Sequence, residues 1–258
     1  MLLKKILKES GNPPLLGAFL NLPVPALVEV VAWAGFDFII FDGEHGNFSG
    51  LELEECTRAA DLLNLPTVVR LPEMNAGRIQ NVMDSNAHGI QIPSVNTAEL
   101  AAATVAATRF PPRGNRGFGS TTRAAGFGFI PRKEVLTQAE ARSTVTIQVE
   151  TRQGVENLPQ ILTVDGIDSI FIGTSDLSLE YGYQSTTAPE MMSLLKAIID
   201  QVDAAGKVCG VHIVDWKDIP PMAQLGVRYF TVSALAVMAN SLGEVRESFR
   251  DKTRSVTK

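Results

Sequence analysis

The stretch Phe38–Pro72 reads FIIFDGEHGNFSGLELEECTRAADLLNLPTVVRLP, and its pattern decides the fold. It opens with an apolar run, Phe38–Phe41, passes through a polar turn into a helix-forming segment, Leu51–Leu63, and closes with a second apolar run, Thr67–Leu71. Apolar runs without alternating polar residues are typical of parallel strands that are covered on both faces. The stretch therefore predicts a strand, a crossover helix and a second strand.

The same unit recurs along the chain. Eight apolar runs are predicted as strands: Leu15–Leu20, Phe38–Phe41, Thr67–Leu71, Gly89–Ile92, Val145–Val149, Ser169–Ile172, Val208–Ile213 and Tyr229–Val232. Seven segments are predicted as helices: Pro25–Ala34, Leu51–Leu63, Ala76–Ser85, Thr97–Thr108, Pro189–Ala205, Ile219–Leu225 and Ala234–Phe249. This rhythm in about 250 residues is that of a (β/α)8 barrel. We therefore predict an α/β fold, a TIM barrel forming a single domain over residues 1–258. The alternative is a doubly wound sheet, but no G-x-G-x-x-G turn follows the first strand.

The composition excludes several classes of protein. The 258 residues are 45% hydrophobic and 20% charged, as is typical of soluble globular proteins. The net charge of −5 disfavours a nucleic-acid partner, because such proteins usually carry a basic excess. The most apolar stretch, Pro25–Phe41, is interrupted by acidic residues, so no membrane span is expected, and Met1–Ser10 lacks the apolar core of a targeting segment. Cys56 and Cys209 are far apart, which fits the reducing cytoplasm.

Polar residues gather where the predicted strands end. In a barrel of this kind, the active site lies at the carboxyl ends of the strands. The residues expected at this rim are Asn21, Asp42, Glu44, His45, Arg70, Ser94, Gln148, Glu150, Thr174, Ser175, Asp176, His212, Asp215 and Ser233. The amino ends of the strands carry no comparable group. We therefore predict the active site at the carboxyl rim.

Glu150 and Asp176 end consecutive strands and are expected to be neighbours. Two such carboxylates suit an acid/base pair or a hard divalent cation such as Mg2+ or Mn2+, which is bound through few carboxylates, waters and substrate oxygens. For Asp176 the alternative is a helix N-cap. Lys207 and Lys217 are not placed for a Schiff base, so a metal is expected to be the electron sink.

Arg70 follows an apolar strand, so its guanidinium is expected at the rim, where its fork suits carboxylate or enolate oxygens. The alternative for Arg70 is a buried ion pair. His45 is predicted to be the general base, because the pKa of an unperturbed imidazole lies near neutrality. Asp42 and Glu44 are close in sequence and are candidates to orient His45 or raise its pKa.

The longest gap between predicted strands contains Phe110–Phe129, FPPRGNRGFGSTTRAAGFGF. Loops of this length in compact domains are usually functional or disordered. Its arginines, Arg113, Arg116 and Arg123, are interleaved with aromatic residues. We therefore expect a loop that covers the substrate or contacts a subunit, with a plain surface excursion as the alternative.

Five motifs together resemble the HpcH/HpaI aldolases, which are class II, metal-dependent pyruvate aldolases of the phosphoenolpyruvate/pyruvate barrel superfamily. They are FDFIIFDGEH (Phe36–His45), PTVVRLP (Pro66–Pro72), PPRGNRGFG (Pro111–Gly119), IQVET (Ile147–Thr151) and IFIGTSDLS (Ile170–Ser178). The resemblance covers nearly the whole chain, in order and with compatible spacing.

The resemblance implies a role for each matched residue. Glu150 and Asp176 would ligate the divalent metal (Mg2+, Mn2+ or Co2+), with no organic cofactor. The pyruvate would be held by Gln148 and by the backbone around Ser175 and Asp176. The enolate would be stabilised by Arg70. His45 would act as acid/base through water, and Asp84 would raise its basicity. The family also implies a homo-oligomer, a hexamer built as a trimer of dimers that exchange the last helix, Ala234–Phe249.

The chain departs from the family pattern at two places. Thr174 and Ser175 stand where a proline is usual, and His212 and Trp216 stand where smaller or apolar residues are common. The second departure bears on the aldehyde partner, and the role of His212 stays open.

The expected activity is that of a carbon–carbon lyase. It would cleave a 4-hydroxy-2-oxo acid, of the 2-keto-3-deoxy sugar acid or 4-hydroxy-2-oxoalkanedioate type, into pyruvate and an aldehyde. One alternative is an acyl-CoA carbon–carbon lyase of the malyl- or citramalyl-CoA type, which the acidic balance of the chain disfavours. Another is a non-catalytic barrel that serves in binding or assembly. The intact set of candidate catalytic residues argues against that possibility.

Overall fold

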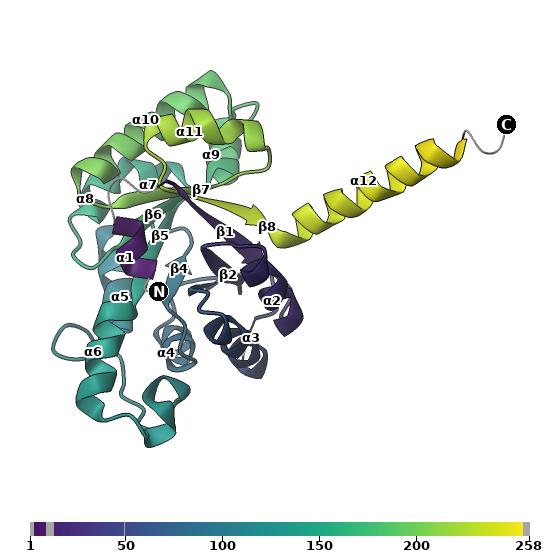
Figure 1. Ribbon diagram of the computed structural model, residues 1–258. Coiled ribbons are helices and arrows are strands. Elements are labelled where there is room, and N and C mark those ends of the chain that lie inside the picture. The colour runs from purple at the N-terminus through teal and green to yellow at the C-terminus, as the bar shows by residue number, and fades with distance from the viewer. Residues whose placement is uncertain (1–2, 9–12, 49, 255–258) are drawn as a thin grey trace.

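A computed structural model describes residues 3–8, 13–48 and 50–254 (Figure 1). Eight parallel strands pair in sequence order and close into a barrel. They are β1 Leu15–Leu20, β2 Phe38–Asp42, β3 Thr67–Arg70, β4 Gly89–Ile92, β5 Thr144–Val149, β6 Ser169–Ile172, β7 Val208–His212 and β8 Tyr229–Ser233. The register β1–β8 joins Gly17 to Thr231 and closes the cylinder. The predicted (β/α)8 barrel is therefore confirmed.

Helices follow the strands, and those between consecutive strands cover the outside of the barrel. The helices of the described residues are α1 Leu3–Lys8, α2 Pro25–Trp33, α3 Gly50–Leu62, α4 Ala76–Asp84, α5 Ala98–Thr108, α6 Arg132–Arg142, α7 Arg152–Glu156, α8 Leu158–Leu162, α9 Thr174–Tyr181, α10 Pro189–Ala204, α11 Ile219–Leu225 and α12 Ala234–Arg254, with 3-10 turns η1 Arg123–Gly128 and η2 Trp216–Asp218. Asn75 and Thr97 begin α4 and α5, because each side chain accepts a backbone N–H of the first turn. No helix among the described residues is long and apolar enough to cross a bilayer.

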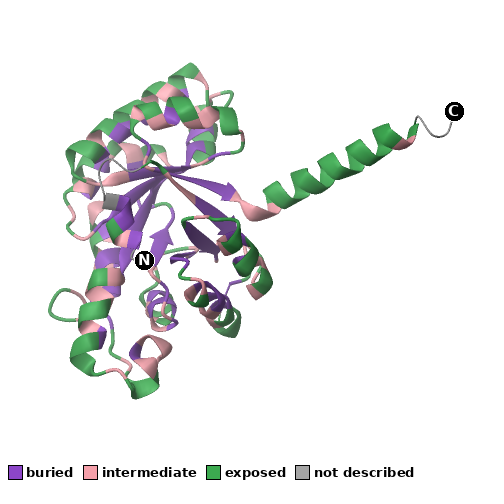
Figure 2. Ribbon diagram, viewed as in Figure 1, coloured by how far each residue is buried: buried purple, intermediate pink, exposed green. Residues whose placement is uncertain are grey.

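Side chains of each strand alternate between the helices and the barrel interior. On β7, Cys209 and Val211 belong to the apolar layer beneath the helices, whereas Gly210 lies against the ring of Tyr229 inside the barrel. A Cβ at Gly210 would lie 2.0 Å from that ring, so only glycine leaves room for it. Figure 2 shows the resulting contrast between buried strands and largely exposed outer helix faces.

The amino end of the barrel is filled by apolar side chains. Phe38, Val68 and Tyr229 belong to a buried cluster inside it, and Leu3, Ile6 and Leu7 of α1 are part of the same cluster. Burying such a side chain contributes roughly 1.5–3 kcal/mol. The helix α1 was not predicted; it lies within Met1–Ser10, of which residues 1–2 and 9–10 fall outside the described part of the chain.

The segment Phe110–Phe129 is ordered by ion pairs with its own barrel. Arg116 Nη2 donates to Asp84 Oδ1 over 2.7 Å. Arg123 Nη2 lies 2.7 Å from Asp61 Oδ2. The segment ends in η1 and is followed by α6, a helix that the sequence reasoning missed, as it missed α7, α8 and α9.

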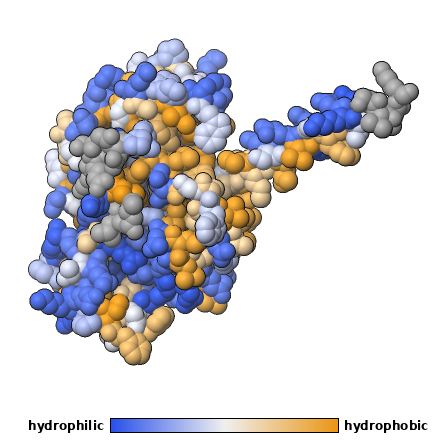
Figure 3. All heavy atoms as spheres, in the orientation of Figure 1, coloured by the Kyte–Doolittle hydropathy of each residue, from blue (hydrophilic) through white to orange (hydrophobic). Residues whose placement is uncertain are grey.

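The last helix, α12, projects away from the barrel (Figure 1). None of its 21 residues is buried. Its exposed apolar side chains are Val237, Met238, Leu242, Val245 and Phe249. Orange spheres gather along one side of α12 in Figure 3, so its apolar residues form a stripe.

Candidate active site

A cavity of about 370 Å³ opens at the carboxyl ends of the strands. It is lined by Phe19, Asn21, Asp42, His45, Arg70, Gln148, Phe171, Gly173, Thr174, Ser175, Asp176, His212 and Ser233. Most of the polar residues expected at the rim therefore meet in one place. This is the end of the barrel at which enzymes of this architecture carry their chemistry.

Arg70 is the centre of a charged cluster. Its Nε and Nη2 donate to the two oxygens of Asp42 over 2.9 and 2.7 Å, a bidentate pair. Its Nη1 lies 3.0 Å from Glu44 Oε2, and its guanidinium carbon lies 4.8 Å from the centre of the Phe19 ring. Arg70 therefore forms the ion pair that was the alternative to a role at the rim. Its side chain nevertheless also lines the cavity. The guanidinium has five N–H groups and makes three contacts with these carboxylates, so donors remain for a ligand.

The pKa values of the two carboxylates in this cluster are shifted in opposite directions. Burial alone would raise the pKa of Asp42, but the hydrogen bonds and charge of Arg70 outweigh it and hold that pKa below its usual value. Burial raises the pKa of Glu44 above its usual value, although the charges of Arg70 and His45 oppose this shift. Asp42 is therefore a fixed counter-ion of Arg70.

His45 reaches the mouth of the cavity with 72% of its side chain exposed. Its backbone N–H donates to Asp42 Oδ1 over 3.2 Å, and its Nε2 lies 3.9 Å from Glu44 Oε2. Asp42 therefore holds the loop rather than the imidazole ring, and Glu44 is the carboxylate beside the ring. Gly46 keeps this loop tight, because a Cβ there would lie 2.3 Å from the carbonyl oxygen of Asp42.

Glu150 is a buried carboxylate with defined partners. Its Oε1 accepts both the backbone N–H and the hydroxyl of Ser94, each over 2.8 Å, and its Oε2 contacts the amide of Gln148. Ser94 adopts φ +50°, a left-handed conformation that is uncommon for a residue with a side chain. Such strain is typically retained at functional sites.

Asp176 lies in the first turn of α9 and is exposed to the cavity. The N-cap of α9 is Gly173, without a side-chain cap, so the alternative role of Asp176 as an N-cap is wrong. Its position in the first turn instead places a negative charge near the positive end of the helix dipole.

The Glu150–Asp176 region has the chemistry of a hard-cation site. Among the described residues, no cluster of three or more histidine, cysteine or acidic side chains is arranged to hold a metal. Mg2+ is commonly bound by one or two carboxylates, with waters and substrate oxygens completing the shell. Gly173 lies against Glu150, and a Cβ there would be 2.9 Å from Glu150 Oε2, in the space beside the carboxylate. These residues fit Mg2+ or Mn2+.

Asp84 lies elsewhere. It ends α4 and accepts from Arg116, and it does not line the cavity of its own chain. Because helices run back from the carboxyl to the amino end of the barrel, the end of α4 is remote from the rim. The role that the resemblance assigns to Asp84 is therefore not met within one chain.

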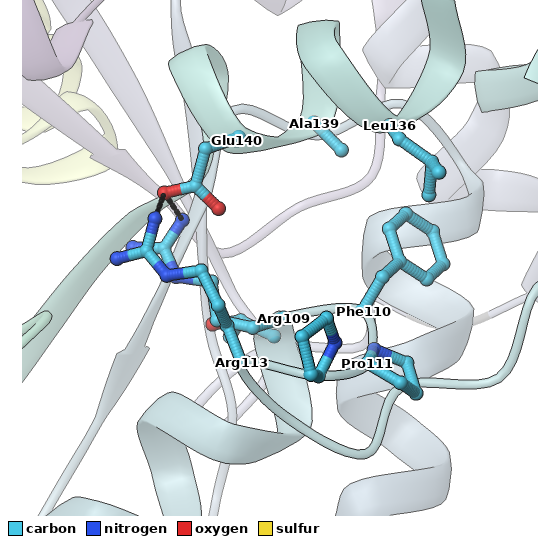
Figure 4. A pocket seen from close by; sticks show the side chains of 9 residues that line it. Arg109, Phe110, Pro111, Arg113, Leu136, Ala139 and Glu140 are labelled. Carbon is cyan, nitrogen blue, oxygen red and sulfur yellow. Dashed lines mark hydrogen bonds and ion pairs between the residues drawn. The ribbon is translucent and has the colours of Figure 1, made fainter. Parts of the chain in front are cut away.

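The arginine-rich segment does not cover this cavity either. Figure 4 shows a separate cavity of about 130 Å³, where Arg113 and Arg109 approach the same oxygen of Glu140 over 2.6 and 3.8 Å. Arg109 also approaches Asp168, the residue before β6, so this cavity lies at the amino end of the barrel. No residue of Phe110–Phe129 lines the active-site cavity, so the expectation that the segment covers the substrate is not met within one chain.

Some residues of the site were not predicted from the sequence. Phe19 and Phe171 line the cavity although they stand inside apolar runs. Gln91 donates to Gln148 Oε1 over 2.7 Å and fixes its amide. A signal existed for Gln91, because it is a polar residue in the interior of the short apolar run Gly89–Ile92.

The profile of the HpcH/HpaI aldolase/citrate lyase family matches residues 15–223, which include every candidate site residue except Ser233. The chain belongs to the HpcH/HpaI aldolase/citrate lyase family. The resemblance expected from the five motifs is thereby confirmed. Because the chain belongs to this family and is similar to named aldolases, the protein is a carbon–carbon lyase of the aldolase type.

Relatives within this family carry several names. The 2-keto-3-deoxy-L-rhamnonate aldolase of Salmonella gallinarum (strain 287/91 / NCTC 13346) is 37% identical over 211 residues, which are 81% of this chain and 77% of that protein. An HpcH/HpaI aldolase/citrate lyase family protein from Burkholderia cenocepacia J2315 superposes with a TM-score of 0.89 at 28% identity, covering 96% of this chain and 98% of that one. Citrate synthase SbnG superposes with a TM-score of 0.87 at 26% identity, covering 98% of this chain and 99% of that one.

Proposed function

We propose that this aldolase cleaves a 4-hydroxy-2-oxo acid, of the 2-keto-3-deoxy sugar acid or 4-hydroxy-2-oxoalkanedioate type, into pyruvate and an aldehyde. The observation that carries the proposal is the convergence of a fixed arginine, an exposed histidine and the Asp176 carboxylate on one cavity. Glu150 lies directly behind this lining, in contact with Gln148 and Gly173. The name of the Salmonella relative supports the sugar-acid type.

One group of residues would bind the 2-oxo acid end of the substrate and stabilise its enolate. Gln148 and the backbone at the start of α9, around Ser175 and Asp176, would bind the 2-oxo acid, because amides at a helix start suit a carboxylate. The remaining N–H groups of Arg70 would donate to the oxygen that becomes the enolate oxygen. Glu150 and Asp176 would hold Mg2+, Mn2+ or Co2+, which supplies Lewis-acid stabilisation of the same negative charge.

Bond cleavage then needs one base. His45, at the mouth of the cavity, would take the proton of the C4 hydroxyl through a water. The electron pair of that oxygen forms the aldehyde carbonyl as the C3–C4 bond breaks. The released pair forms the enolate, whose C3 is protonated to give pyruvate. Asp42 keeps Arg70 charged and in place throughout.

The test is release of pyruvate from a 2-keto-3-deoxy sugar acid. We expect activity to be lost after EDTA treatment and to return with Mg2+ or Mn2+. The Glu150→Gln and Asp176→Asn variants should lose at least about 100-fold in kcat/KM. Glu140→Gln, which changes a carboxylate outside the cavity, is the matched control and should stay within about twofold. Activity that resists EDTA and is trapped by borohydride in the presence of pyruvate would contradict the metal mechanism.

The alternative, an acyl-CoA carbon–carbon lyase, needs basic side chains for the phosphates of CoA. Arg113, Arg116 and Arg123 would have to supply them, but each is engaged in an ion pair and none lines the cavity. This favours the free-acid reaction. Turnover of malyl-CoA or citramalyl-CoA without turnover of any free 4-hydroxy-2-oxo acid would reverse the preference.

We further propose a homo-oligomer, a hexamer in which dimers exchange α12, working in the cytoplasm. The exposed apolar stripe of α12 supports exchange, because such a stripe is usually covered by another surface. In such an assembly Asp84 of one subunit would raise the basicity of His45 in a neighbouring subunit. The two buried cysteines, Cys56 and Cys209, are unpaired thiols, which agrees with a reducing compartment.

A further inference from the structure

His212 is a half-buried histidine that the proposed chemistry does not use. It is the last residue of β7 and lines the active-site cavity. Its ring meets the ring of Phe19 edge to face, with centroids 5.8 Å apart and an angle of 71°. Its partner on the neighbouring strand is Thr231, whose Oγ1 lies 3.3 Å from His212 Nδ1. The ring is therefore held by packing on one side and by β8 on the other.

The contacts of Thr231 determine which ring nitrogen carries the proton. The single hydroxyl proton of Thr231 has an acceptor in the carbonyl oxygen of Val211, 3.3 Å away. Its lone pairs are then left to accept from His212, which makes Nδ1 the protonated nitrogen. In a neutral imidazole the other nitrogen, Nε2, is then a bare acceptor. The positive charge of Arg70 acts on this ring and favours a lone pair over a second N–H on the cavity side.

The ring is neutral near neutral pH. Burial lowers the pKa of His212 below its ordinary value, and the charge of Arg70 lowers it further. Nε2 has no hydrogen-bond partner within the described part of the chain. A ligand that fills the cavity must therefore supply a donor to Nε2 or leave it unpaired.

Position in the barrel shows which part of the substrate meets His212. The groups proposed for the pyruvate portion stand on β3, β5 and the start of α9. His212, Ser233 and Asn21 stand on or beside β7, β8 and β1, which form the other half of the rim. Asn21 Oδ1 is a second acceptor there without a partner. The three polar side chains of this half carry no negative charge, and two of them present an acceptor without a partner among the described residues.

We infer that His212 Nε2 accepts a hydrogen bond from a hydroxyl group on the aldehyde portion of the substrate, and so selects hydroxyaldehydes over unsubstituted and carboxylate-bearing aldehydes. The inference rests on the proposed aldolase function. A second carboxylate at His212 would place an acceptor against the bare Nε2, with no cation among the three polar residues of this half. A hydroxyl instead pairs with Nε2, and a ligand without that hydroxyl leaves Nε2 unpaired once it covers the ring.

The test runs in the aldol direction with pyruvate and three aldehydes: lactaldehyde, propanal and succinic semialdehyde. Lactaldehyde and propanal have the same number of carbons and differ by one hydroxyl. We expect the wild-type protein to prefer lactaldehyde in kcat/KM by about tenfold or more, since one satisfied hydrogen bond supplies that much discrimination. The His212→Leu variant should lose most of this ratio, mainly through a higher KM for lactaldehyde. His212→Gln, which keeps an acceptor, should retain most of it.

A third variant covers the possibility that His212→Leu does not fold. Thr231→Val keeps the volume but removes the group that fixes the Nδ1 proton, and it should lower the same ratio several-fold. An unchanged ratio in both His212→Leu and Thr231→Val would overturn the inference, as would a wild-type preference for succinic semialdehyde. Failure of the proposed function is distinguishable, because the wild-type protein would then consume none of the three aldehydes with pyruvate.

Discussion

Gly173 is the position where one methyl group should disable the site without unfolding the barrel. It joins β6 to α9 and has φ −76° and ψ 76°, so alanine meets no left-handed strain there. A Cβ would nevertheless lie 2.5 Å from Glu150 Cβ and 2.9 Å from Glu150 Oε2. Gly173→Ala therefore tests the placement of Glu150 through space alone.

The expected size of the effect follows from these distances. Carbon atoms in contact stay about 3.5–4.0 Å apart, so Glu150 must retreat by at least about 1 Å. The two hydrogen bonds from Ser94, now 2.8 Å each, would stretch to roughly 3.8 Å, beyond hydrogen-bond range. Overpacking and the lost bonds together should lower the free energy of unfolding by about 2–4 kcal/mol. A displacement of about 1 Å in an active site costs about 100-fold in rate.

The assay combines pyruvate release, Mn2+ binding by calorimetry and urea unfolding. We expect Gly173→Ala to remain folded, because domains of this size have about 5–15 kcal/mol in reserve, and to lose both Mn2+ affinity and turnover. Gly77→Ala is the matched control: Gly77 is exposed in α4, and the nearest atom to a new Cβ is 3.4 Å away. Turnover and Mn2+ affinity of Gly173→Ala within about twofold of wild type would refute the reasoning.

Three further predictions concern charge, pH and assembly. Asp42→Asn should lower the free energy of unfolding by about 3 kcal/mol and abolish turnover, because it leaves a largely buried arginine short of a partner; equal urea midpoints would contradict this. Burial, followed by a neighbouring arginine charge, lowers the pKa of His88 to about 3, so its contribution to stability is complete above the unfolded pKa of about 6.5 and is lost as pH falls toward 3. Urea unfolding should then lose up to about 1.4 kcal/mol per pH unit below pH 6.5, and His88→Gln should flatten this slope, whereas parallel slopes would count against the reasoning. Leu242→Asp should convert the protein to a smaller species in sedimentation, unlike Glu244→Gln on the same helix, and an unchanged mass would exclude α12 as the contact.

The barrel could be predicted because its signal is local. Each strand is an apolar run of about five residues, and each run is separated from the next by a helix-length segment. The helix α1 could not be predicted in the same way. Leu3, Ile6 and Leu7 are buried only because the open amino end of the barrel presents Phe38 and Tyr229 to them. That surface exists only once the eight strands have closed.

The positions of the site residues could be predicted from the sequence, but their contact partners could not. Placing Arg70, Glu150 and Asp176 at the carboxyl rim needed only the strand ends and the rule for this architecture. The partners of these groups depend on register between strands: β2 and β3 pair Asp42 directly with Arg70, whereas Glu150 meets Ser94 through a left-handed turn. Neither contact has a sequence signature. Asp84 shows the opposite case, since a resemblance assigned it a role that one chain cannot supply.

The cavity divides into two halves with different physical demands. The half formed by β2, β3, β5 and α9 concentrates charge, and its members constrain one another: Asp42 fixes Arg70, and Ser94 and Gly173 fix Glu150. A change there disturbs several contacts at once. On the other half, His212 is held by one hydroxyl and one aromatic ring, so replacing it breaks few contacts. The charged half therefore sets the reaction, while His212 can change the accepted aldehyde without disturbing it. The residue at position 212 can therefore change without loss of the charged residues of the other half.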